Sequence, residues 1–214
     1  MSNFEYIISS LPFLTADFKY AEGSGFNSVL EEIRSNLSEK DNKELDFLLK
    51  GFDPDQLNPD FYAQALSHPQ RFIREYFRFD LNLRNAKVAY INKALGRPAD
   101  MDIMTGEGSD GDRMDIDGFR FTGGEFEEAL QAENALAEKD LVDREKALDD
   151  LVWKKVEDLT TFHYFDIDAV LGYLAKLKIA DRWIVLDKEK GRELFEKLVR
   201  EVKGTFKGVR YTEE

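Results

Sequence analysis

The stretch QRFIREYFRFDLNLRNAKVAYINKAL, residues 70–95, decides the fold of this chain. His68-Pro69 is suited to the start of a helix, and Gly96 with Pro98 beyond it is typical of a helix end. The apolar side chains of the stretch fall on one broad arc of a helical wheel: Phe72, Ile73, Tyr76, Phe77, Leu83, Val88, Ile91 and Leu95. So wide an arc predicts a long helix at the centre of the protein.

Two sets of charged residues on this helix are of interest for function. Arg71, Arg74 and Arg78 line the side opposite the apolar arc, together with two asparagines, Asn82 and Asn85. This arginine stripe is a candidate partner-binding surface for an acidic protein. The alternative is that it docks on an acidic helix of the same chain.

Asp80 and Arg84 fall inside the apolar arc, four residues apart and therefore on one face of the helix. A charge that is buried without a partner is strongly unfavourable. We therefore predict that these two residues form a structural buried ion pair and are not a functional site.

Capping residues and apolar periodicity predict further helices on both sides of this one. Ser38, Asn58 and Asp166 are suited to N-caps, and Gly51 is suited to a left-handed C-cap. The predicted helices cover residues 26–37, 38–51, 58–66, 68–96, 122–161, a segment from 166 onward, and 187–204. A bend near Glu138 is compatible with the pattern. Only two segments have a strand-like character, residues 4–9 and, weakly, 183–186.

Residues 99–121 interrupt the helical pattern with four glycines and seven acidic residues. They predict a mobile acidic surface loop, which is followed by a capping box of Thr122 and Glu125. We expect an all-α protein of six to seven packed helices. The loop divides it into an N-terminal helical lobe (1–98) and a C-terminal helical lobe (122–214), or it lies within one continuous domain.

Composition excludes several classes of function. The net charge is −13, and residues 100–150 contain 17 acidic against 5 basic residues, which disfavours nucleic acid and anionic lipid as partners. A basic protein partner and a solvated acidic face are the two alternatives. Cysteine is absent, which fits a cytoplasmic protein, and no apolar run is long enough to span a membrane.

Known catalytic and ligand-binding patterns do not fit this sequence. In an EF-hand register, the acidic loop places Arg113 or Met114 at positions that require an oxygen ligand. The loop glycines lack the Gly-Lys-Ser/Thr ending of a phosphate-binding loop. His68 and His163 have no second histidine at metal-ligand spacing, so packing or capping is the favoured interpretation of both. We predict no enzymatic activity, no cofactor and no metal.

Three segments resemble a bacterial family of uncharacterised proteins encoded beside V-type ATPase subunits. They are residues 4–14 (FEYIISSLPFL), the middle-helix segment from Leu83-Arg84-Asn85 to Leu95-Gly96-Arg97, and Phe165-Asp166-Ile167-Asp168 with residues 173–177, Arg182 and the helix start at 187–191. The family is similar in presumed role to the C-type connector subunit of V/A-type ATPases (called d-type in eukaryotes), although this chain is too short for the three lobes of that connector.

The resemblance implies a non-catalytic connector that joins the central shaft of the ATPase to its membrane proteolipid ring. It implies a cytoplasmic location, peripheral to the inner membrane, with ATPase subunits as partners and with no membrane span of its own. The alternatives are an assembly or regulatory factor for the same ATPase and a helical interaction protein of an unrelated pathway.

Overall fold

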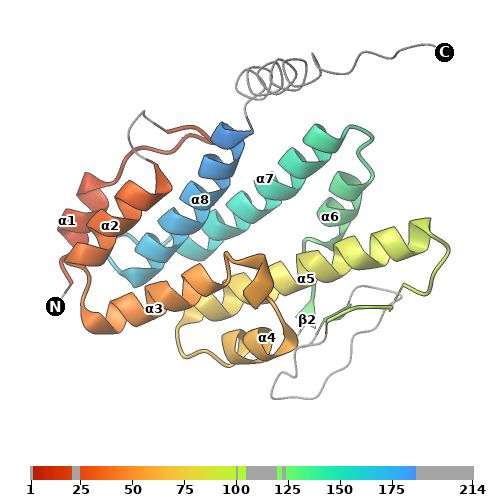
Figure 1. The fold of residues 1–214 in the computed structure, drawn as a ribbon, viewed down its shortest axis with the longest axis horizontal. Helices are drawn as coiled ribbons and strands as arrows, with labels where there is room; N and C mark the ends of the chain where they lie inside the picture. Colours follow the sequence, from red (N-terminus) through yellow and green to blue (C-terminus); the bar gives the residue numbers. More distant parts are fainter. Residues whose placement is uncertain (1, 21–24, 100, 105–119, 122–123, 187–214) are drawn as a thin grey trace, which may run out of the picture.

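The computed structural model describes residues 2–20, 25–99, 101–104, 120–121 and 124–186 (Figure 1). As predicted, this part of the chain is all-α, with a single two-stranded hairpin of minimal length. Its helices are α1 (Phe4–Ser10), α2 (Phe26–Asn36), α3 (Glu39–Lys50), the 3₁₀ turn η1 (Pro54–Gln56), α4 (Pro59–Leu66), α5 (Arg71–Ala94), α6 (Ala129–Leu136), α7 (Leu141–Thr160) and α8 (Ile167–Val185).

The long helices α5, α7 and α8 form the frame of the protein (Figure 1). Helices α7 and α8 are an antiparallel pair joined by a short turn, and α5 packs against both of them. Helices α1 and α2 pack on α8, α4 packs on α5, and α6 packs against both α5 and α7. Each short helix therefore covers an apolar side of one of the long helices.

The main hydrophobic core takes residues from both sides of residues 99–121. Phe72 and Phe77 of α5 are fully buried against Leu171 and Leu174 of α8, in the same cluster as Leu48 of α3. Burial of each such side chain stabilises the fold by about 1.5–3 kcal/mol. The segments before and after residues 99–121 are therefore packed around a shared core.

Helix α5 is central, but its two sides differ from the predicted pattern near its end. Asn82 and Asn85, predicted on the polar side, are buried, whereas Ile91 and Leu95 of the apolar arc are more than half exposed. The reason is that residues 101–104 return along α5. The Asn85 side chain donates to the Met104 carbonyl at 2.7 Å and accepts from the Met104 amide at 3.1 Å.

Residues 101–104 belong to the predicted acidic loop, and they are held against α5. Besides the two bonds from Asn85, the buried Asn92 donates to the carbonyl oxygen of Met101 at 2.6 Å. The prediction of mobility for residues 105–119 lies outside the described residues, as does the predicted helix 187–204.

Local capping confirms several predicted helix starts. Asn58 and Asp166 accept hydrogen bonds from the amides of Phe61 and Ala169. Ser38 accepts from the Asp41 amide, and the Ser2 hydroxyl completes this cap by accepting from the Ser38 amide at 2.6 Å and donating to Asp41. Such caps satisfy amides that the first helical turn leaves without partners.

The prediction of a left-handed C-cap at Gly51 is wrong. Gly51 has φ −71° and ψ −11°, which any residue can adopt. Glycine is required there because an added Cβ would overlap the ring of Phe77, which packs directly on the backbone. A positive φ of 67° occurs instead at Gly96, directly after the C-cap of α5.

Three further predictions need correction. The strand-like residues 4–9 form α1, which Asn3 caps, and residues 183–185 form the last turn of α8. Glu125 does not start a helix: β1 (Arg120–Phe121) pairs antiparallel with β2 (Gly124–Glu125), and α6 begins at Ala129. The predicted bend near Glu138 is a complete break, because the Asp140 side chain caps a new helix.

Within the described residues, no helix is both long enough and apolar enough to cross a membrane.

Candidate functional site

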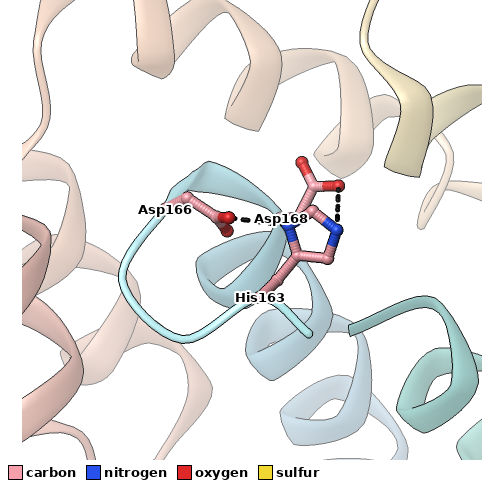
Figure 2. A group of neighbouring side chains, drawn as sticks. All are labelled: His163, Asp166 and Asp168. Atoms are coloured by element: carbon pink, nitrogen blue, oxygen red, sulfur yellow. Dashed lines mark hydrogen bonds and ion pairs between the residues drawn. The ribbon is translucent and has the colours of Figure 1, made fainter. Parts of the chain in front are cut away.

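A cluster of polar side chains joins the start of α5 to the turn between α7 and α8. We call it the junction cluster, and it consists of Gln70, Arg71, His163, Asp166 and Asp168. Figure 2 shows His163 in the turn, with Asp166 on one side of its ring and Asp168 on the other. The cluster therefore connects residues that are more than 90 positions apart in the sequence.

Asp166 determines how His163 is oriented. One oxygen of Asp166 caps α8 by accepting from the Ala169 amide at 3.0 Å, and the other lies 2.6 Å from His163 Nδ1. A carboxylate can only accept, so the network assigns the proton to Nδ1. His163 Nε2 then accepts from the guanidinium of Arg71, whose Nη2 is 2.9 Å away.

Asp168 is the buried carboxylate of the junction cluster. Its Oδ1 accepts from the side-chain amide of Gln70, and its Oδ2 pairs with Arg71 Nη2 at 3.4 Å. Gln70 in turn caps α5 by accepting from the Phe72 amide. Because burial of an ionised carboxylate is unfavourable without partners, Asp168 positions the start of α5 against the start of α8.

Ligand-type atoms of His163, Asp166 and Asp168 lie within 4.8 Å of one another, which is close enough to suggest a metal site. The guanidinium of Arg71 occupies that space. Its Nη2 contacts the Leu159 carbonyl oxygen at 2.6 Å as well as His163 Nε2 and Asp168 Oδ2. The cluster thus contains its own cation, and its chemistry is that of a polar lock between three helices.

The turn that this lock holds carries three strongly exposed aromatic side chains. Phe162, Tyr164 and Phe165 are 85%, 66% and 57% exposed, and we call residues 162–165 the aromatic turn. Its backbone is held by a hydrogen bond of 2.9 Å from the His163 amide to the Thr160 carbonyl oxygen, and by the His163 side chain. Aromatic side chains clustered on a surface are typical of sites where other molecules bind.

The predicted arginine stripe makes its contacts within the chain. Arg71 belongs to the junction cluster, Arg74 donates to the carbonyl oxygen of His68 at 2.9 Å, and Arg78 pairs with Glu75 at 2.8 Å. Arg74 also lies 3.3 Å from Glu75, so one carboxylate of the same helix serves two of the three arginines. Of the three, Arg71 is the one whose contacts described above reach other helices.

Asp80 and Arg84 are placed in contact, at 2.7 Å between Asp80 Oδ2 and Arg84 Nε. Their side chains are 21% and 40% exposed, so the pair is half-buried and not fully buried as predicted. The wheel placed both residues in the apolar arc, but they lie at the edge of that arc, where long side chains reach solvent. The buried partner of Asp80 is Tyr62, whose hydroxyl donates to Oδ2 at 2.6 Å.

Sequence reasoning missed the junction cluster and the aromatic turn. It recognised Asp166 as a cap and assigned His163 to packing, but the third partner, Arg71, comes from a distant helix. The available signal was Phe162-His163-Tyr164-Phe165 itself, in which three aromatics surround one histidine immediately before a capped helix.

The fold and the site together define an all-helical protein whose most conspicuous surface feature is an aromatic turn held in place by a polar lock. The chain belongs to the family described as "Protein of unknown function (DUF2764)", whose model matches residues 53–205. That span contains both the junction cluster and the aromatic turn. No curated protein and no solved structure matches the chain.

Proposed function

We propose that this protein is a non-catalytic component of a V-type ATPase that acts through protein contacts, as a C-type connector between the central shaft and the membrane ring. The observation that carries the contact role is the aromatic turn. Its three aromatic side chains are exposed on a backbone whose hydrogen bonds are formed before any partner arrives.

The energetics favour such a turn as a binding surface. Full burial of one aromatic side chain contributes about 1.5–3 kcal/mol, and a preformed turn avoids much of the entropy cost of ordering a loop on binding. A connector that transmits force needs this combination, because a flexible contact would yield before it transferred load.

The association with an ATPase is supported by the resemblance to proteins encoded beside V-type ATPase subunits. One of the three resembling segments, Phe165-Asp166-Ile167-Asp168, forms the end of the aromatic turn and part of the junction cluster. The segment that carries the resemblance and the surface that fits a contact role therefore coincide.

Deletion of the gene, followed by assays of ATP hydrolysis and ion pumping in isolated membranes, tests this proposal. We expect hydrolysis that is uncoupled from pumping, or loss of the catalytic head from the membrane. Fully coupled pumping in the deletion strain would exclude the connector and would leave the assembly-factor alternative.

Complementation of the deletion links the function to the surface. The variant Phe162→Ser/Tyr164→Ser should fail to restore coupling. The matched control Leu130→Ser/Leu141→Ser, which removes two apolar side chains that are also about two-thirds exposed, should restore it. Equal behaviour of the two variants would remove the aromatic turn from the proposal.

A further inference from the structure

We propose that the aromatic turn binds a protein segment that combines apolar side chains with lysine or arginine residues. This inference rests on the contact role proposed above and specifies the chemistry of the partner. It depends on what surrounds Phe162, Tyr164 and Phe165, and on which of the neighbouring charges are already neutralised within the chain.

Phe162 continues the exposed side of α7. Thr161, between the helix and Phe162, keeps helical dihedral angles (φ −52°, ψ −35°). Residues four apart on a helix lie on one side, so Phe162 follows directly below Asp158. Glu157 and Asp158 are both exposed. The apolar tip of the turn therefore adjoins a carboxylate-bearing surface.

The charges around the aromatic turn do not balance. Asp166, partly exposed, accepts from the uncharged His163 and has no cation as its partner in this pair. The nearby cation Arg71 is paired with the buried Asp168, and Lys176 approaches Glu157 only to 3.8 Å. The surface next to the aromatics is consequently negative, in a chain whose net charge is −13.

A negative rim around exposed aromatics selects between possible partners. An acidic segment or an anionic lipid surface would be repelled, whereas a basic rim on the partner would be attracted and oriented. Aromatic rings also interact favourably with lysine and arginine side chains over their faces. Apolar residues of the partner would cover Phe162 and Phe165, and its cations would face Glu157, Asp158 and Asp166.

Site-specific photo-crosslinking of the full-length protein in its native cells tests the inference. The photoactivatable variant Phe162→benzoylphenylalanine is compared with Leu130→benzoylphenylalanine, a position on α6 that is 67% exposed and also has acidic neighbours. Mass spectrometry then identifies each adduct. We expect position 162 to give a peptide that is apolar and net positive, at about tenfold the yield of the control, equivalent to about 1.4 kcal/mol.

Charge reversal provides the second measurement. Asp158→Lys, combined with the crosslinker at position 162, should lower the adduct yield by about tenfold, because the new cation repels the partner. A lipid adduct, an acidic peptide, a yield equal to that at position 130, or no effect of Asp158→Lys would each overturn the inference. A basic apolar peptide from a protein outside the ATPase would support it and contradict the proposed ATPase association.

Discussion

The hydroxyl group of Tyr62 donates a hydrogen bond of 2.6 Å to Oδ2 of Asp80 and links α4 to α5. Tyr62 is fully buried, and both its burial and the neighbouring Asp80 carboxylate raise the pKa of the phenol. The same oxygen accepts from Arg84. Asp80 therefore serves two donors, one of which has no access to water.

Loss of Asp80 should be costly because of Tyr62. We expect Asp80→Ala to lower the free energy of unfolding by about 1–3 kcal/mol, since the buried hydroxyl loses its acceptor. Arg84→Leu should cost less, because Arg84 reaches solvent. Urea denaturation measures both effects, and the double variant Asp80→Ala/Tyr62→Phe should recover part of the loss. A double variant that is the sum of its single variants would show that the two residues are not coupled.

Arg71 should contribute more to stability than its neighbours in the arginine stripe. Arg71→Met removes the donor shared by Leu159, His163 and Asp168, and we expect a loss of about 2–3 kcal/mol. Arg78→Met is the matched control. It breaks an ion pair with Glu75 on the same helix and should cost about 0–0.5 kcal/mol. Equal losses in urea denaturation would contradict the polar lock.

His68 should make stability depend on pH. Burial lowers the pKa of His68, against the opposing effect of the Glu44 carboxylate 3.5 Å away. The unfolded chain, with an ordinary pKa of about 6.5, then binds a proton more readily than the native state. Stability should therefore be complete above that value and decrease as the pH falls below it.

The measurement for His68 is the free energy of unfolding at several pH values. The parent should lose more stability than His68→Gln as the pH falls below about 6.5. Parallel curves for the two proteins would mean that His68 has the same proton affinity in both states.

The asparagines of α5 should determine the order of residues 101–104. Asn85→Ala removes both hydrogen bonds to Met104, at an expected cost of about 1–2 kcal/mol, and the amide of Met104 should exchange its hydrogen faster. Asn92→Ala is the control, because it removes only the bond to Met101. Unchanged exchange at Met104 in the Asn85 variant would show that packing alone holds the segment.

Local interactions explain why so much of the fold could be predicted. The start of α4 at Asn58 and of α8 at Asp166 depends on contacts within three residues, and the apolar arc of α5 is a property of one helix. Gly51 was misread because its reason lies in another helix: the ring of Phe77 occupies the space of a side chain.

The junction cluster could not be predicted for the same reason. Arg71 and His163 are 92 positions apart, and no spacing rule connects residues at that distance. Residues 4–9 alternate enough to resemble a strand, but a strand needs a neighbour with which to pair. A single cap at Asn3 and the burial of Ile7 favour a short helix instead.

Phe18 has a consequence for experiments on this protein. Its ring lies 5.3 Å from the ring of Trp153 and 5.9 Å from that of Trp183, and these are the only two tryptophans in the chain. Intrinsic tryptophan fluorescence therefore reports on one end of the α7–α8 pair and on the docking of the segment around Phe18. A change in emission signals release of that segment, and the aromatic turn at the opposite end can rearrange without altering the signal.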